Sequence, residues 1–227
     1  MKPSCVVLFS GGLDSATTLY LARKEGFKVH ALSLRYGQIH SREIQSARSI
    51  AGQLNIPHRI IQISLPWKGS ALVDKSKRLP RNRSVAQMSL QVPVTYVPAR
   101  NTIFLSFALS WAEVIGAESV WIGANAVDYS GYPDCRPNYL KAMEKVFDLG
   151  TKKGKIKIKA PLLRKTKAQI VRLACSLGVP LEKTWSCYEG GRKPCGTCDS
   201  CLLRAKGFDE AGVEDDKVSS LKFQVSS

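Results

Sequence analysis

The sequence lacks long hydrophobic runs and has few acidic residues. No apolar run approaches the ~20 residues that a membrane-spanning helix needs. The first apolar run, residues 5–9, is cut by two glycines and is too short for the core of a secretory signal, so we expect a cytoplasmic location. Only 18 acids face 34 lysines and arginines, and no acid occurs between Asp148 and Glu182. The net charge of +16 favours anionic partners such as nucleotides, pyrophosphate, carboxylates or nucleic acid.

The composition is otherwise typical of a soluble globular protein, with 44% hydrophobic and 23% charged residues. A length of 227 residues suits one α/β domain with an appended element. Strand-like and helix-like stretches alternate with short turns, which predicts a Rossmann-like parallel sheet with right-handed crossovers. The predicted strands are 5–9, 28–34, 58–63, 119–122 and 155–160, and the predicted helices are 14–24, 41–54, 102–115, 138–149 and 166–177.

Two stretches do not follow this alternation. Residues 65–95 contain several prolines, many basic residues and little periodicity, so we expect a mobile basic lid or loop there. Residues 207–227 are polar and contain acids, and we expect them to form a tail with little to bury.

The stretch Ser10-Gly11-Gly12-Leu13-Asp14-Ser15 ends the first predicted strand and opens the first predicted helix. Glycines let a ligand approach the backbone, and a helix N-terminus attracts anions. The two serines add hydroxyl donors, and Asp14 is suited to hold Mg²⁺ or a water. These features favour a phosphate-bearing ligand, although a glycine turn before an ordinary capped helix has the same composition. The stretch lacks the Gly-Lys-Ser/Thr ending of a Walker loop, which argues against γ-phosphoryl transfer by that machinery.

Other polar residues stand at the ends of later predicted elements. Arg100 and Asn101 open a mostly apolar helix, a position that suits either a phosphate or carboxylate contact or simple capping. Lys167 lies in the first turn of another helix, where the helix dipole disfavours a cation that has no anionic partner. Lys167 could therefore contact a phosphate, or it could be a lysine that faces solvent. Residues 128–137 hold two acids, two tyrosines and an arginine. We expect either a loop that shapes a site for a planar ring, with Asp134 accepting from a guanine-like edge, or a rigid turn.

Four of the seven cysteines occur within residues 187–201, in the spacing Cys-x7-Cys-x2-Cys-x2-Cys. Four thiolates complete a tetrahedral zinc site with no open position, so we expect a structural zinc ion. An iron–sulfur cluster, disulfides and a redox Cys-x-x-Cys pair are the alternatives. We expect Cys5, Cys135 and Cys175 to bind no metal, with Cys5 and Cys175 in the core. The predicted metal ligands are Cys187, Cys195, Cys198 and Cys201.

The motifs at the two ends of the chain together resemble one family. Residues 10–15 match the Ser-Gly-Gly-x-Asp-Ser signature of the pyrophosphate-loop ATPases, which cleave ATP between its α- and β-phosphates. With the four-cysteine pattern, residues 5–208 resemble the QueC family of 7-cyano-7-deazaguanine synthases. Ala99 stands where that family usually has glycine, and residues 65–95 match it only loosely. Further matching stretches are Val97-Pro98-Ala99-Arg100-Asn101, Phe104-Leu105-Ser106, Asp128-Tyr129-Ser130-Gly131-Tyr132-Pro133-Asp134-Cys135-Arg136 and Leu203-Arg204-Ala205-Lys206-Gly207-Phe208.

The resemblance implies an adenine nucleotide alpha hydrolase-like (HUP) fold and a reaction. The family converts 7-carboxy-7-deazaguanine, ammonia and ATP into a nitrile base used for queuosine or archaeosine in tRNA. The reaction passes through an adenylated acid and an adenylated amide, so no Ser-His-Asp or Cys-His arrangement is needed. The implied catalytic candidates are Asp14, Arg100 and Lys167. The implied ATP-binding residues are Phe9, Ser10, Gly11, Gly12, Leu13, Asp14, Ser15 and Ala16. The implied substrate-binding candidates are Asn101, Tyr132, Asp134 and Arg136.

The resemblance also implies an organisation and partners. Residues 1–183 would form the ATPase domain, 184–210 the zinc element and 211–227 a tail. We expect one structural zinc ion per chain, ATP as co-substrate with Mg²⁺, a homodimer, and neither a membrane nor a specific nucleic acid as partner. One alternative is another pyrophosphate-loop ligase or a tRNA-modifying enzyme, although tRNA thiolation favours a cysteine pair that Cys135 lacks. The other is a basic zinc-containing RNA-binding module, for which the chain shows no RNA motif.

Overall fold

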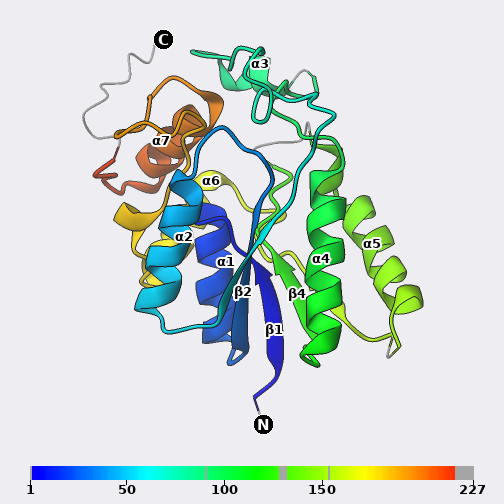
Figure 1. The fold of residues 1–227 in the computed structure, drawn as a ribbon. Coiled ribbons are helices and arrows are strands. Elements are labelled where there is room, and N and C mark those ends of the chain that lie inside the picture. Colours follow the sequence, from blue (N-terminus) through cyan, green and yellow to red (C-terminus); the bar gives the residue numbers. More distant parts are fainter. Residues whose placement is uncertain (1, 90, 128–131, 153, 218–227) are drawn as a thin grey trace.

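The fold is built on a five-stranded sheet whose strand order is β3-β2-β1-β4-β5 and whose strands are all parallel (Figure 1). The structure is a computed structural model, and it describes residues 2–89, 91–127, 132–152 and 154–217. The predicted parallel α/β architecture is therefore confirmed. The strands are β1 (Ser4–Leu8), β2 (Lys28–Arg35), β3 (His58–Gln62), β4 (Ser119–Ile122) and β5 (Lys157–Lys159).

Helices cover both faces of the sheet, which explains why its central strands are almost wholly apolar. Side chains of β1 alternate between two cores: Cys5 and Val7 pack with α1, α2 and α6, whereas Val6 and Leu8 pack with α4 and α5. The helices on the first face are α1 (Leu13–Lys24), α2 (Arg42–Gln53) and α6 (Lys167–Ser176); those on the second are α4 (Arg100–Val114) and α5 (Pro137–Gly150).

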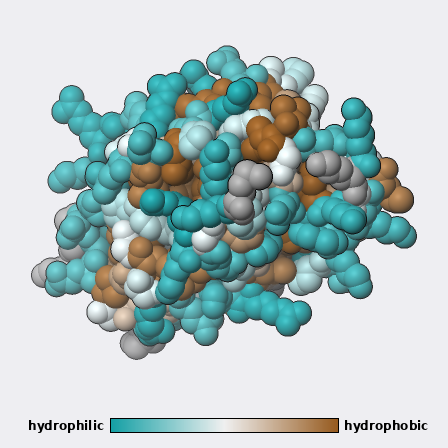
Figure 2. Space-filling model, turned by 90° about the horizontal axis from the view of Figure 1, so that it is seen from below, coloured by the Kyte–Doolittle hydropathy of each residue, from teal (hydrophilic) through white to brown (hydrophobic). Residues whose placement is uncertain are grey.

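The strand order reverses at the boundary between β1 and β4. From β1 the chain proceeds outward to β2 and β3 on one side, and later to β4 and β5 on the other. In open parallel sheets, ligands bind beyond the carboxyl ends of the strands at such a reversal. The opposite end of the molecule, seen in Figure 2, is hydrophilic over most of its surface, with separate hydrophobic areas.

Residues 199–215 are packed against the domain to a greater extent than the sequence suggests. Helix α7 (Asp199–Ala211) packs against α6, and Phe208 is buried in the first core. Beyond the helix, Asp215 is also buried and accepts hydrogen bonds from Arg204 at 2.5 and 3.0 Å. The expectation that residues 207–227 have little to bury is therefore wrong up to residue 215, because a periodic helix extends through residues 207–211.

The remaining segments qualify two further expectations. Cys5 is buried as predicted, but Cys175 is exposed on α6, because its position in the helix faces away from both cores. The segment 65–95 contains a short helix, α3 (Val85–Ser89), and buries several apolar side chains, including Leu72 and Met88. The mobility of this segment stays a prediction.

No helix in the described part of the chain is long and apolar enough to cross a membrane. The two 3₁₀ turns are η1 (Pro133–Cys135) and η2 (Leu181–Lys183).

Candidate functional site

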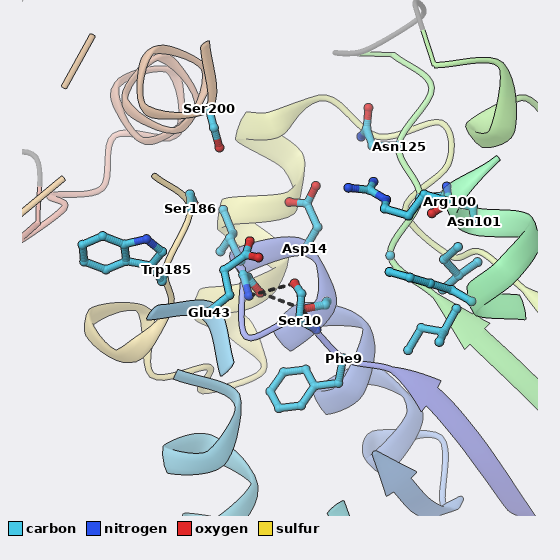
Figure 3. Close-up of a pocket in the computed structure, with 18 of the residues that line it drawn as sticks. Phe9, Ser10, Asp14, Glu43, Arg100, Asn101, Asn125, Trp185, Ser186 and Ser200 are labelled. Atoms are coloured by element: carbon cyan, nitrogen blue, oxygen red, sulfur yellow. Dashed lines mark hydrogen bonds between the residues drawn. The ribbon is translucent and has the colours of Figure 1, made fainter. Parts of the chain in front are cut away.

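A cavity of about 290 Å³ lies at the carboxyl ends of β1 and β4, where the strand order reverses (Figure 3). Its walls come from residues 8–10 and 12–15, the first turn of α2, the start of α4, residues 122–125, the segment before α7 and the first turns of α7. The cavity therefore lies where a parallel sheet is expected to bind its ligand.

Residues 10–15 form a tight loop that is held by its own serines. The Ser10 backbone N–H donates to Ser15 Oγ at 3.2 Å, and Ser15 Oγ donates to the Gly12 carbonyl at 3.1 Å. Gly11 has φ +88°, and a Cβ at this position would lie 2.4 Å from the Glu43 carbonyl oxygen. Glycine at position 11 is thus required both by backbone conformation and by the close packing of α2.

The predicted ATP-binding residues divide into those that line the cavity and those that support it. Gly11 contacts α2, and Ala16 is buried in the core beneath the loop. The members that line the cavity are Phe9, Ser10, Gly12, Leu13, Asp14 and Ser15.

Two of the predicted catalytic residues meet in the cavity. Lys167, in the first turn of α6, places Nζ 2.8 and 2.9 Å from the two carboxylate oxygens of Asp14 in α1. Both side chains are largely shielded, with 14% and 26% of their surface exposed. The anionic partner that a cation at a helix N-terminus requires is therefore, in this structure, Asp14.

Gly207 determines how Lys167 reaches the cavity, a role that sequence reasoning missed. Gly207 lies inside α7, and a Cβ there would lie 2.2 Å from Lys167 Cγ and 2.7 Å from Lys167 Cβ. The lysine stem thus crosses α7 at a point where only glycine leaves room.

Arg100 projects into the cavity from the first residue of α4 (Figure 3). Burial alone would lower the pKa of its guanidinium, but Tyr36, Tyr132 and Asp134 outweigh this and raise it, so Arg100 remains a cation. Ala99, just before it, has the left-handed conformation φ +53°, ψ 23°. A glycine would adopt this conformation without strain, whereas the Cβ of an alanine carries a steric cost there.

The predicted substrate-binding residues lie in different surroundings. Asn101 and Tyr132 line the cavity, and the Tyr132 hydroxyl lies 2.9 Å from Thr95 Oγ1. Asp134 is buried against the start of α4, where its carboxylate accepts from the Asn101 backbone N–H at 3.0 Å. Arg136 is exposed and does not line the cavity. A substrate contact by these residues stays a prediction, and the neighbouring residues 128–131 of the predicted ring site lie outside the described residues.

Glu43 is a cavity residue that the sequence analysis did not select. It lies in the first turn of α2 and points into the cavity beside Ser10 and Asp14 (Figure 3). Burial raises the pKa of its carboxyl group to about 7, although the charge of Arg100 lowers it. The signal in the sequence was an acid at the start of the helix after the second strand, which is common on ordinary helices.

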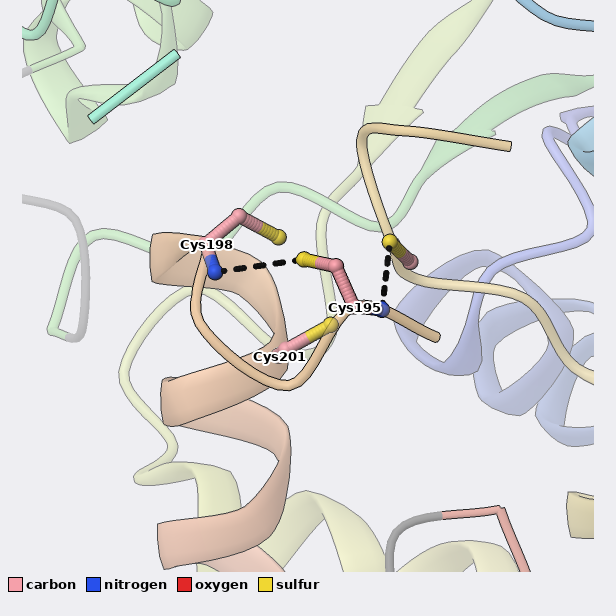
Figure 4. Close-up of side chains that lie close together, drawn as sticks. Cys195, Cys198 and Cys201 are labelled. Atoms are coloured by element: carbon pink, nitrogen blue, oxygen red, sulfur yellow. Dashed lines mark hydrogen bonds between the residues drawn. The ribbon is translucent and has the colours of Figure 1, made fainter. Parts of the chain in front are cut away.

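The four predicted ligand cysteines converge, with sulfur atoms all within 4.8 Å of one another (Figure 4). Cys187 accepts hydrogen bonds from the Cys195 and Glu189 backbone N–H groups at 3.3 and 3.4 Å. Hydrogen bonds from the Cys198 and Cys201 thiols, with these N–H groups, hold the pKa of Cys187 well below its usual range. A compact set of four thiols with thiolate-stabilising donors is suited to hold a metal ion.

The cysteine element also closes one side of the cavity. The Trp185 backbone N–H donates to the Gly11 carbonyl at 3.0 Å, and Ser186 and Arg204 line the cavity from the same direction. Residues 65–95 are fastened to this element as well, because Arg81 pairs with Cys198 through a β-bridge and Arg83 forms an ion pair with Asp199.

The sheet order and the serine–glycine loop at its reversal point define a Rossmann-like α/β protein with a C-terminal four-cysteine cluster. A structure described as a predicted subunit of a tRNA methyltransferase from Methanocaldococcus jannaschii shares the fold, with a TM-score of 0.50 at 18% identity, over 95% of this chain and 91% of that chain.

Sequence comparison then identifies the family. The profile described as "Queuosine biosynthesis protein QueC" matches residues 4–212. A 7-cyano-7-deazaguanine synthase of Trichodesmium erythraeum is 55% identical over 216 residues, covering 92% of this chain and 97% of that protein. The enzyme of the same name from Thermoplasma acidophilum is 52% identical over 217 residues, which cover 94% of this chain and 91% of that protein. The chain therefore belongs to the QueC family, and the resemblance inferred from its sequence motifs is confirmed.

Proposed function

We propose that the chain is an ATP-dependent ligase that converts 7-carboxy-7-deazaguanine and ammonia into 7-cyano-7-deazaguanine. One observation carries the proposal: the serine–glycine loop, the Asp14–Lys167 pair and Arg100 surround one cavity in a member of the QueC family. Backbone N–H groups and cations around one cavity match the needs of a reaction that expels pyrophosphate.

In the first step, ATP binds with its phosphates on residues 10–15. The substrate carboxylate attacks the α-phosphorus, a new O–P bond forms, and pyrophosphate leaves with the electrons of the broken bond. Arg100 and Lys167 stabilise the negative charge that develops on the phosphate oxygens, since both cations enter the cavity and Lys167 also contacts Asp14 of the loop. Ammonia then displaces AMP to give an amide, and a second adenylation on the amide oxygen permits loss of AMP and leaves the nitrile.

Two metal ions complete the proposal. Each Asp14 oxygen keeps a lone pair beyond its bond to Lys167, so Asp14 is suited to ligate the Mg²⁺ that accompanies ATP; the ion supplies positive charge to the phosphates. Cys187, Cys195, Cys198 and Cys201 would hold one zinc ion, which supplies folding energy to the wall of the cavity. We also propose a cytoplasmic homodimer, with no specific nucleic-acid partner.

The competing candidate is a tRNA-thiolating enzyme of the same fold, which would use a reactive cysteine near the ATP site. Cys135 lines the cavity, but burial raises the pKa of its thiol to about 11, and it accepts a hydrogen bond from Asn101 at 3.3 Å. A thiol in this environment stays protonated at neutral pH and is a poor nucleophile. The environment of Cys135 therefore supports amide and nitrile formation over thiolation.

The test is exchange of labelled pyrophosphate into ATP, which reports reversible adenylation of the acid. We expect exchange that requires both 7-carboxy-7-deazaguanine and Mg²⁺ and needs no ammonium. Exchange in the absence of the acid, or none with it, would contradict the proposal.

A further inference from the structure

Glu43 is an acidic side chain of the cavity to which the proposed reaction gives no role. Its position is fixed by backbone packing, because the first turns of α2 lie directly against Gly11. Ser46, one turn later, donates from Oγ to the Gly11 carbonyl at 2.9 Å. The Glu43 carboxylate is therefore held next to the loop that would bind the phosphates.

The Glu43 carboxylate differs from the other acids around the cavity in its partners. Asp14 is paired with Lys167, and Asp134 accepts from the start of α4. In contrast, no residue of the described chain donates a hydrogen bond to the Glu43 side chain, which points into open space in the cavity (Figure 3). A partly buried carboxylate without a donor is suited to a ligand that brings its own N–H groups.

The charges facing Glu43 come from several elements. Asp14 and Lys167 form a mutual pair on α1 and α6, whereas Arg100 on α4 acts on Glu43 as a nearby positive charge. Arg204 on α7 is neutralised by Asp215. Burial raises the pKa of three further cavity groups, Tyr36, Tyr132 and Cys135, so these three stay protonated at neutral pH.

The proposed reaction needs a proton acceptor at this place. Like a lysine side chain, free ammonia is almost entirely protonated at neutral pH, and ammonium has no lone pair with which to attack a carbonyl carbon. A carboxylate that changes charge near neutral pH is matched to the transfer of one proton. Building on the proposed function, we propose that Glu43 binds ammonium in the cavity and removes one proton, delivering neutral ammonia to the adenylated acid.

The step balances without a further reactant. One proton moves from ammonium to the Glu43 carboxylate, and the nitrogen lone pair forms the new C–N bond. The C–O bond to the adenylate breaks, and AMP leaves with its electrons. A second proton leaves the nitrogen for the AMP phosphate or water, and Glu43 returns its proton to water, so that the carboxylate is restored.

The test compares two nucleophiles on the same adenylated acid. Hydroxylamine is uncharged at neutral pH and attacks without prior loss of a proton, giving a hydroxamate. In Glu43→Gln we expect ammonium-dependent amide formation to fall about 100-fold or more, while hydroxamate formation is unchanged. The inflection near pH 7 in the ammonium rate of the wild-type protein should disappear in the variant. Glu43→Asp keeps a carboxylate on a side chain one methylene shorter, so its rate of amide formation should fall less. If Glu43→Gln does not fold, Glu43→Asp provides the same comparison between amide and hydroxamate formation.

Equal losses with both nucleophiles would overturn the inference and assign Glu43 to adenylation or to the metal that accompanies ATP. Unchanged rates with both would overturn it as well. If the wild-type protein forms no hydroxamate and shows no acid-dependent pyrophosphate exchange, the proposed function itself fails, which is a distinct outcome.

Discussion

Lys167 Nζ lies 2.8 and 2.9 Å from the two carboxylate oxygens of Asp14, although the two residues are 153 positions apart in the sequence. The pair joins the loop of residues 10–15, at the start of α1, to the first turn of α6. It brings a cation to the loop, which lacks the lysine that a Walker loop contains in its own sequence.

The first prediction concerns this pair. Lys167→Gln should lower acid-dependent pyrophosphate release about 100-fold or more, because a cation positioned at developing phosphate charge is lost. Asp14→Ala should abolish release while the circular dichroism spectrum stays unchanged. The matched control is Lys159→Gln, which removes the lysine of an exposed ion pair with Glu25, 3.2 Å apart and away from the cavity. Wild-type turnover in either cavity variant would contradict the role of the pair.

The second prediction separates Gly207 from an ordinary helical glycine. Replacing glycine by alanine inside a helix normally stabilises it by up to about 1 kcal/mol. At position 207 the new Cβ would lie 2.2 Å from Lys167 Cγ, so Gly207→Ala should destabilise the protein by about 1–3 kcal/mol and reduce pyrophosphate release.

Gly52→Ala is its control, since Gly52 lies in α2 with nothing within 4 Å of the added Cβ. We expect this variant to be as active as the wild type and slightly more stable in urea unfolding. A Gly207→Ala variant that behaves in the same way would show that α7 does not constrain the lysine.

The third prediction is a pH dependence of stability. The pKa of Glu43 rises from 4.5 to about 7 in the folded protein, so the folded state binds more protons than the unfolded state between these values. The free energy of unfolding therefore falls as pH rises through this range, because Glu43 must ionise in a buried position. The full loss, about 3 kcal/mol, is reached above pH 7.

Glu43→Gln removes this cost. We expect the variant and the wild type to have similar unfolding free energies below pH 4.5, and the variant to be the more stable protein at pH 8. Urea unfolding at a series of pH values measures the difference, and a difference that does not change with pH would contradict the raised pKa.

The fourth prediction links the metal to residues 65–95. Elemental analysis should find about one zinc ion per chain, and Cys198→Ser should lose it. Loss of the metal should also release residues 81–83, since the Asn82 backbone N–H donates to the Thr197 carbonyl at 2.8 Å within the cysteine element. Faster amide hydrogen exchange at residues 81–83 after chelation measures this coupling.

Cys175→Ser is the matched control, because Cys175 is exposed on α6 and is not a member of the cluster. It should keep its zinc and its exchange rates. Recovery of iron with visible absorbance, or zinc retained in Cys198→Ser, would contradict the assignment.

The sequence was sufficient to predict the parallel sheet, because apolar β-prone runs alternate with helical periodicity at regular intervals. It also predicted the convergence of the four cysteines, since their short spacing restricts where the thiols can go. It misjudged Cys175 and residues 207–215, because local pattern says little about which face of a helix is covered. The tertiary contact of α7 with α6 decides that.

The candidate site could be predicted only where a local motif marks it. Residues 10–15 carry such a motif. For Lys167 the helix dipole left a phosphate contact and a solvent-facing lysine open, and the structure pairs this lysine with Asp14. Glu43 carries no motif, and Gly207 lies in the matching stretch 203–208, which gives no sign of a contact with Lys167. The importance of both residues arises from the contact of α2 with Gly11 and of α7 with Lys167. Those contacts join segments distant in sequence and became visible only in the folded chain.

The central claim is tested most directly by the products formed from 7-carboxy-7-deazaguanine, ATP and ammonium, analysed by mass spectrometry together with AMP and pyrophosphate. Two adenylations predict the mass of 7-cyano-7-deazaguanine, with two AMP and two pyrophosphate released per nitrile. Release of ADP and phosphate, or no product beyond the unchanged acid, would contradict the account.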